Sequence, residues 1–233
     1  MKSLRLLVFA ALAVSAQAGL IHSYTFDGTG VTDSAGSADG GLSPIGASVG
    51  GGVLTLDGSG WVEFSTHLIP TSGSYSVLLD FRLDGPQSGI AEFISQGHSG
   101  GPGFYLGTDG GIHFRVTDSW PYPLGNLPTD ADWHRLGLVV DSTAGNSRLF
   151  LDGLLMDTLG FAIATTTGGT STKFGRQFSH YEEFFNGDLD NVRIYDHAVS
   201  ADETGFSAAP EPSALALALL GVVGLALRRR VAR

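Results

Sequence analysis

The stretch WHRLGLVVDSTAGNSRLFLDGLLMDTL, residues 133–159, decides the fold. Within it, two apolar runs, 148–151 and 154–157, stand on either side of Asp152 and Gly153. An Asp-Gly pair readily supplies the positive φ angles of a tight type I′ turn. The stretch therefore predicts a β-hairpin that turns at Asp152 and Gly153.

The segment that precedes this hairpin, 133–140, is a third predicted strand. Trp133, Leu136, Leu138 and Val140 mark one face of it. Large aromatic side chains on the apolar face of a strand belong to the core. We therefore expect Trp133 to be buried.

Outward from this region, runs of β-branched and aromatic residues alternate with Gly, Asp and Ser clusters. No stretch between the two chain ends keeps an apolar period of 3.6 residues over three turns. Many short strands with glycine turns and no helices predict a sandwich or a barrel. The predicted strands are 21–26, 53–56, 61–64, 75–83, 103–106, 112–116, 133–140, 148–151, 154–157 and 189–195.

Six short motifs follow one another along the chain between residues 21 and 203. They are YTFDGTG (24–30), VTDSAGSADGG (31–41), LTLDGSGWVEF (54–64), WHRLGLVVD (133–141), RLFLDG (148–153) and FNGDLDNVRIYDHAVS (185–200). In this order they resemble the LamG-like, or concanavalin A-like, jellyroll family. The resemblance implies an all-β fold, a two-sheet antiparallel jellyroll sandwich. The stretch 85–128 departs most from the family pattern.

Charge and composition limit the possible partners. The chain has 233 residues, a net charge of −10 and no cysteine. Residues 19–209 hold seven basic and 22 acidic side chains, which leaves this part at −15. Such a domain repels phosphate, so we expect no nucleic-acid partner. The absence of cysteine excludes disulfides, Cys-zinc sites and thiol catalysis.

The N-terminal stretch MKSLRLLVFAALAVSAQA, residues 1–18, has the pattern of a secretory signal peptide. A charged start is followed by an apolar middle, 6–14, and by the small-residue sequence AQA. We predict that signal peptidase cleaves between Ala18 and Gly19. The alternative is a first core helix of the fold.

The C-terminal stretch APEPSALALALLGVVGLALRRRVAR, residues 209–233, combines a Pro-Glu-Pro sequence, an apolar run and an arginine cluster. As a helix the uncharged run 213–227 spans about 22 Å at 1.5 Å per residue. That is short of the hydrocarbon core of about 30 Å, so the run crosses the inner membrane only transiently. A simple membrane anchor is the alternative.

This C-terminal pattern resembles the PEP-CTERM sorting signal of Gram-negative bacteria. The resemblance implies processing by an exosortase and delivery to the cell surface or the exopolysaccharide matrix. Together with the preceding observations, this predicts three segments: a signal peptide over 1–18, a jellyroll domain over 19–206 and a sorting signal with an apolar helix over 210–233. The residues that carry the sorting-signal pattern are Pro210, Glu211, Pro212, Arg228, Arg229 and Arg230.

A structural calcium ion is the first candidate ligand of the domain. Calcium takes carboxylate and carbonyl oxygens from loops, and Asp27 and Asp33 lie in a glycine-rich segment. The jellyroll resemblance implies an ion between this first loop and the last strand. The predicted ligands are therefore Asp27, Asp33 and Asp190. The alternative is that these acids stabilise turns.

A glycan is the second candidate ligand. Sugars stack their apolar faces on exposed aromatic rings while polar groups fix their orientation. The segment DSWPYPLGN, 118–126, places Trp120 and Tyr122 between prolines, which favours a loop. Aromatic residues that pack beneath a long loop are the alternative. The predicted contacts are Trp120, Tyr122, Tyr105, His98 and Tyr181.

No complete catalytic set can be assembled from the sequence. Glycosidases on related jellyrolls use alternating acids, and the nearest stretch here, 188–191, lacks glutamate. The string GHSGGP, 97–102, offers one serine, but the other two members of a serine-protease triad cannot be identified in the sequence. We therefore expect a non-enzymatic, exported adhesion or binding module that contacts polysaccharide. The alternatives are a glycoside hydrolase or lyase on the same fold and a purely structural matrix protein.

Overall fold

Antiparallel strands make up the regular structure of the protein. The computed structural model describes residues 19–87, 89–97, 103–116, 124–165, 171–178 and 181–200. The described residues contain no helix, and so no helical segment among them could cross a membrane. The predicted signal peptide, 1–18, and the predicted sorting segment, 210–233, lie outside the described residues.

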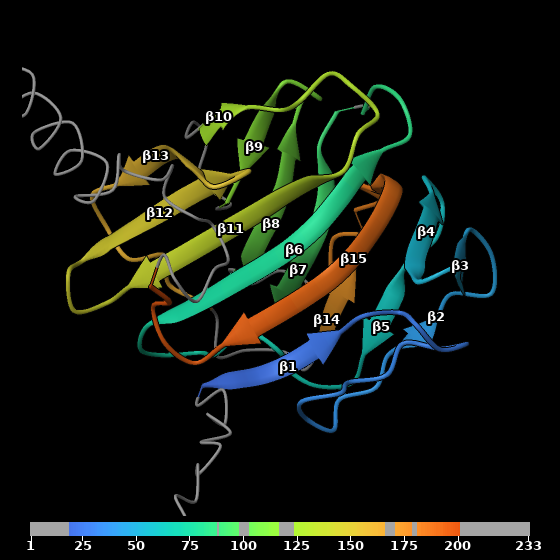
Figure 1. Ribbon diagram of the computed structural model, residues 1–233, viewed down its shortest axis with the longest axis horizontal. Helices are drawn as coiled ribbons and strands as arrows, with labels where there is room; N and C mark the ends of the chain where they lie inside the picture. The colour runs from blue at the N-terminus through green and yellow to red at the C-terminus, as the bar shows by residue number, and fades with distance from the viewer. Residues whose placement is uncertain are drawn as a thin grey trace, which may run out of the picture.

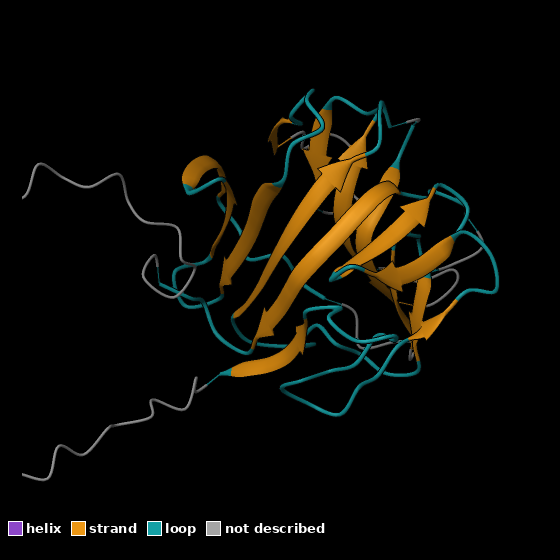
Figure 2. Cartoon of the chain, turned by 45° about the vertical axis from the view of Figure 1, so that its right-hand side comes forward, coloured by secondary structure: helices purple, strands orange, loops and turns teal. Residues whose placement is uncertain are grey.

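The strands form two sheets that stack as the layers of a sandwich, which confirms the predicted fold class (Figures 1 and 2). In the eight-stranded sheet, β1 (Leu20–Tyr24) pairs with β15 outside the main order. That order is β13 (Leu154–Leu159), β12 (Asn146–Leu151), β11 (His134–Asp141), β6 (Tyr75–Leu83), β15 (Asn186–Tyr195), β4 (Val53–Asp57) and β3 (Ala47–Gly50).

The seven-stranded sheet lies behind the eight-stranded sheet in the view of Figure 1. Its order is β10 (Leu124–Asn126), β9 (His113–Arg115), β8 (Phe104–Asp109), β7 (Ala91–Gly97), β14 (Ser171–Phe174), β5 (Val62–Phe64) and β2 (Gly41–Leu42). The sequence did not predict β2, β3, β7, β10 or β14. Strand β7 was missed because it is buried on both faces and yet carries polar residues, which hide the pattern expected of a buried strand.

One apolar core fills the space between the sheets, and aromatic rings join the two layers. The ring of Phe81 on β6 lies 5.0 Å from that of Phe93 on β7, measured between centroids. Tyr24 on β1 contacts Phe64 and Phe174, which come from the opposite sheet. Inward-facing residues alternate with outward-facing ones along each strand, as strand geometry requires.

The predicted hairpin at Asp152 and Gly153 is confirmed. Leu151 pairs with Leu154, and the two turn residues have φ angles of 50° and 85°. The strand before it begins at His134, one residue later than predicted. Trp133 is 40% exposed, so the prediction that it is buried is wrong. The ring lies just outside the strand, where the inward and outward alternation does not hold it against the core.

The outer face of the eight-stranded sheet is divided into two halves. On one half, Leu78, Val139 and Tyr195 form a small second core with Val199. The chain that follows β15 covers this half, and Ser76 fixes it by accepting a hydrogen bond from the Val199 backbone N–H at 3.0 Å. The other half carries charged side chains, which build the candidate site.

Candidate functional site

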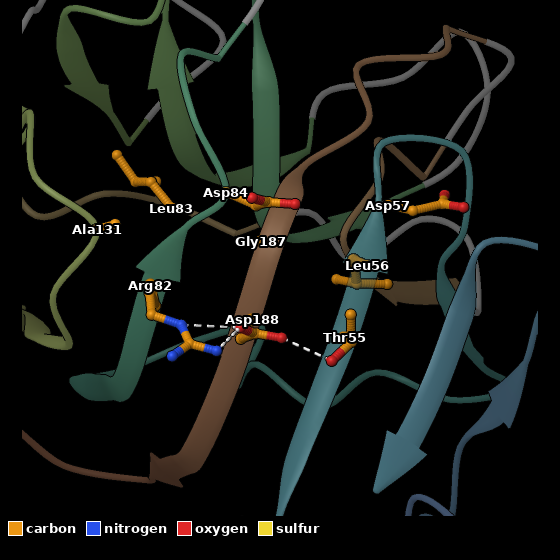
Figure 3. Close-up of a pocket in the computed structure, with 9 residues that line it drawn as sticks. All are labelled: Thr55, Leu56, Asp57, Arg82, Leu83, Asp84, Ala131, Gly187 and Asp188. Carbon is orange, nitrogen blue, oxygen red and sulfur yellow. Dashed lines mark hydrogen bonds and ion pairs between the residues drawn. The ribbon is translucent and has the colours of Figure 1, made fainter.

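Two rows of polar side chains cross the outer face of the eight-stranded sheet. Strand pairing places Thr55, Asp188 and Arg82 side by side on β4, β15 and β6. The Thr55 hydroxyl donates to Asp188 Oδ1 at 2.6 Å. Arg82 donates from Nε and Nη2 to Asp188 Oδ2 at 3.0 and 2.5 Å (Figure 3). This first row is a ladder of charge-assisted hydrogen bonds across three strands.

The second row lies two residues further along β6 and β15 and extends to β11, so that Arg135, Asp80 and Asp190 stand side by side. Arg135 donates from Nε and Nη2 to the two Asp80 oxygens at 2.6 and 2.9 Å. Asp80 and Asp190 stand directly opposite each other, an arrangement that like charges make unfavourable. We call the six residues of the two rows the polar face.

A β-bulge relieves the repulsion between these two acids. Asn191 adopts a φ of 49° at the point where the register between β15 and β6 shifts. Its side-chain amide then donates to Asp80 Oδ2 at 3.0 Å and to Asp190 Oδ2 at 2.9 Å. Bulges commonly re-aim a side chain in this way. The bulge therefore places an amide donor between two carboxylates.

The pKa values of Arg135 and Asp190 are shifted by their surroundings in the polar face. The hydrogen bonds that Arg135 donates to Asp80 raise the pKa of Arg135 above its ordinary value. Desolvation raises the pKa of Asp190, and the charges of Asp80 and Asp27 raise it further. The polar face thus holds three carboxylates, those of Asp80, Asp188 and Asp190, beside two arginines.

Two hollows open onto the polar face. The first, of about 410 Å³, is drawn in Figure 3. Its lining residues are Thr55, Leu56, Asp57, Arg82, Leu83, Asp84, Ala131, Gly187 and Asp188. The second, of about 390 Å³, is lined by Asp27, Gly51, Gly52, Val53, Asp80, Trp133 and Asp190.

Trp133 links the two hollows. It lines the second hollow, and the Arg82 guanidinium carbon, from the first, lies 5.2 Å from its ring centroid. A cation at this distance is attracted to the ring and holds it in place. The polar face thus combines a half-exposed aromatic ring with fixed donors and acceptors.

The predicted calcium ligands do not come together as one set. Asp27 and Asp190 line the second hollow, whereas Asp33 does not. Within the described residues, no group of three or more His, Asp and Glu side chains could hold a metal ion. The residues present therefore do not fit the predicted three-carboxylate site, and calcium binding stays a prediction.

Asp33 instead organises the loop that follows β1. Its side chain is fully buried. Burial by itself would raise its pKa, but hydrogen bonds from its neighbours hold the pKa of Asp33 below the ordinary value. Those neighbours are the His22 ring and the backbone N–H groups of Ser23, Ala35, Gly36 and Ala38. A carboxylate surrounded by N–H donors has little left to offer a cation.

The predicted aromatic contacts are distributed differently. Tyr181 is 56% exposed. Tyr105 is only 3% exposed, beneath the Arg115 guanidinium, so it presents no open ring for stacking. His98, Trp120 and Tyr122 lie outside the described residues, and their contacts stay predictions.

The polar face corresponds to a pattern of alternating polar residues in the sequence. Asp80 and Arg82 alternate with apolar residues in YSVLLDFRL, as Asp188 and Asp190 do in NGDLDNVRIY. A period of two places such residues on one face of a strand. What the sequence could not show is that these two strands are neighbours, because 102 positions separate Leu83 from Phe185.

A buried carboxyl pair lies on the outer side of the seven-stranded sheet. Glu92 on β7 is fully buried, and Arg115 donates to it and also lies 3.6 Å from Glu183. Desolvation raises the pKa of Glu92 to about 8, against the opposing charge of Arg115. Glu92 is inaccessible to a substrate in this arrangement, so the pair is a structural element.

Three comparisons place the chain among known proteins. The family model described as the concanavalin A-like lectin/glucanases superfamily matches residues 56–204. The model of the PEP-CTERM protein-sorting motif matches residues 208–230, which confirms the predicted sorting signal and indicates an exported protein. The search of curated proteins found no match.

Solved structures share the fold at low sequence identity. One is domain 4 of AbnA, a GH43 extracellular arabinanase from Geobacillus stearothermophilus, in complex with arabinotriose. It has a TM-score of 0.68 and 21% identity, over 82% of this chain and 98% of that one. A sialidase from Trypanosoma rangeli has a TM-score of 0.59 and 14% identity, over 80% of this chain and 32% of that one.

The binding domain of botulinum neurotoxin serotype D/C is a third similar structure, with a TM-score of 0.56 and 16% identity. The match covers 79% of this chain and 50% of that one. At such identities the likeness shows the fold alone. The family match and the two-sheet sandwich agree, and the chain belongs to the concanavalin A-like lectin/glucanases superfamily.

Proposed function

We propose that this protein is an exported, non-enzymatic glycan-binding module that acts at the cell surface or in the exopolysaccharide matrix. Its binding site in this proposal is the polar face together with Trp133. The observation that carries the proposal is the half-exposed Trp133 ring held beside two rows of fixed hydrogen-bonding groups.

The chemistry of this face suits a sugar. Trp133 offers an apolar surface on which a pyranose or furanose ring can stack, and Arg82 fixes its orientation. A carboxylate oxygen can accept two hydrogen bonds. Asp188 Oδ1 accepts one from the Thr55 hydroxyl at 2.6 Å, so it can accept a second from a sugar hydroxyl. Side chains that are already held in place lose little entropy on binding.

The similar structures support the same ligand class. The arabinanase domain with the TM-score of 0.68 was solved with arabinotriose. Arabinotriose is therefore a suitable first probe, alongside a panel of other neutral oligosaccharides. The polar face lies on the eight-stranded sheet, next to the apolar half of the outer surface on which Ala198 and Val199 pack.

Titration calorimetry of the exported protein with this panel tests the proposal. We expect one neutral oligosaccharide to bind, and Trp133→Ala to weaken it about tenfold or more, because truncating a central aromatic contact costs more than about 1 kcal/mol. Asp188→Asn removes the charge that holds Arg82 and should weaken binding as well.

A matched control is Ile112→Ala, which truncates a 60% exposed side chain outside the site and should leave affinity unchanged. Equal affinity of the wild type and Trp133→Ala would remove the polar face as the binding site. Turnover of the oligosaccharide would favour the glycosidase or lyase alternative. Self-association without saturable binding would favour the purely structural one.

A further inference from the structure

A cluster of cations and aromatic rings lies on the outer face of the seven-stranded sheet. The Arg176 guanidinium carbon is 4.7 Å from the Trp61 ring centroid and 5.0 Å from that of Phe184. The Lys173 ammonium nitrogen is 5.7 Å from the Trp61 ring centroid. We call Trp61, Lys173, Arg176 and Phe184 the cationic cluster. It plays no part in the polar face, which belongs to the other sheet.

Strand alternation explains why the cluster faces outward. Val62 and Phe174 are paired and point into the core, so Glu63 and Lys173, the next pair along, point away from it. Trp61 shares the outward parity of Glu63. Ser95 on β7 donates to the Arg176 carbonyl at 2.7 Å and fixes the backbone there. The two cations are thus held in place by the fold.

The charges of the cluster are not balanced. Glu63 is the carboxylate that faces Lys173, with 3.8 Å between Oε1 and Nζ, and its side chain is 51% exposed. Arg176 forms no ion pair with a carboxylate in the part of the chain that the structure describes, and its buried Nε has no hydrogen-bond acceptor. The cluster therefore holds two cations and one half-exposed carboxylate that pairs with Lys173 alone, in a domain that is otherwise strongly acidic.

A guanidinium without a carboxylate partner, beside an ammonium group, is unfavourable in free energy unless an anion binds to it. A buried N–H without an acceptor forfeits a hydrogen bond. Arg presents a planar fork that matches carboxylate and sulfate oxygens, and the flanking rings hold that fork in one orientation. Burial lowers the pKa of Lys173; the carboxylate of Glu63 opposes this shift, and the positive charge of Arg176 adds to it. A bound anion would relieve this repulsion.

We propose that the cationic cluster binds the carboxylate or sulfate group of an acidic saccharide. This is a second site, on the opposite outer face of the sandwich from the polar face, and it does not depend on the first.

The test uses the full-length protein and trigalacturonate as the acidic probe, followed by tryptophan fluorescence. We expect saturable binding that weakens with added salt and shifts the emission of Trp61. Arg176→Gln should weaken binding about tenfold to a hundredfold, since a hydrogen bond to a charged group is lost. Arg176→Lys keeps the charge without the fork and should lie in between.

Arg148→Gln is the matched control, because Arg148 also lies over a ring, that of Phe150, but on the eight-stranded sheet. It should bind trigalacturonate like the wild type. Trp61→Phe keeps an aromatic ring and should abolish the fluorescence shift while titration calorimetry shows little loss of affinity, which guards against a variant that fails to fold.

Inorganic sulfate and neutral arabinotriose distinguish the other outcomes. Sulfate binding as tight as that of trigalacturonate would mean a simple anion site and overturn the saccharide assignment. Unchanged affinity in Arg176→Gln would overturn the site. Trp133→Ala should leave trigalacturonate binding intact, so failure of the polar face as a glycan site would not be mistaken for failure here.

Discussion

At the scale of single residues, burial assigns roles that the residue type alone does not. Asp33 is one acid of a glycine-rich segment whose sequence suits calcium equally well as a turn. Its side chain is buried and accepts hydrogen bonds from the backbone N–H groups of Ser23, Gly36 and Ala38. Asp27, six residues earlier, instead lines an open hollow. Two acids in one loop thus have unlike environments.

Glu92 leads to a prediction on pH. Its pKa, raised to about 8 by burial, means that the folded protein keeps a proton which the unfolded chain releases above about pH 4.5. The free energy of unfolding should therefore fall as the pH rises from about 5 to about 8, and level off above. Glu92→Gln cannot ionise and should remove this slope, a difference on the order of a few kcal/mol.

Urea denaturation at pH 5 and pH 8 measures this effect. Glu182→Gln serves as the control, since Glu182 is exposed and its replacement should retain the wild-type slope. Arg115 and Glu183, which lie beside Glu92, are unchanged in all three proteins. Parallel pH profiles for the wild type and Glu92→Gln would contradict the buried, protonated state of Glu92.

At the scale of elements, the hairpin of β12 and β13 depends on its two turn residues. Gly153 has a φ of 85°, and Asp152 one of 50°. Gly153→Ala places a side chain in a left-handed conformation, which costs about 1–2 kcal/mol. Chemical denaturation should show this loss. Gly160→Ala is the control, because an added Cβ there meets open space at an ordinary φ. Equal stability of the two variants would count against the type I′ turn.

Element prediction succeeded for β6, whose residues are mostly apolar, and failed for β7, where buried polar residues interrupt the apolar pattern. The bounds of β6 were predicted correctly, since nine residues rich in apolar side chains leave no ambiguity. In β7, AEFISQG, the polar residues Glu92, Ser95 and Gln96 interrupt the pattern, yet all are buried. Glu92 pairs with Arg115, and Gln96 accepts from the Leu68 and Ile69 backbone. These partners are distant in sequence.

At the scale of the whole molecule, the two sheets share one core and should unfold together. Phe81 on β6 is fully buried and lies 5.0 Å from Phe93 and 6.1 Å from Phe114, which both come from the opposite sheet. Phe81→Ala should lower the free energy of unfolding by about 3–5 kcal/mol. Hydrogen exchange should show the loss of protection in strands of both sheets.

The exposed side chain of Ile45 provides the control for this prediction. Ile45→Ala should change stability by less than about 0.5 kcal/mol and leave exchange unaltered. Loss of protection confined to the eight-stranded sheet in Phe81→Ala would mean that the sheets unfold separately. That result would contradict a single cooperative core.

The sequence by itself determined the strand class, the Asp-Gly hairpin, the family and the sorting signal, because each depends on residue patterns that lie within short contiguous stretches, six of them in order for the family. Only the tertiary structure decided the polar face and the cationic cluster. Arg82 meets Asp188 across 106 positions, and Trp61 meets Arg176 across 115. Such contacts depend on which strands become neighbours and which faces stay open to solvent, and local patterns do not carry that information.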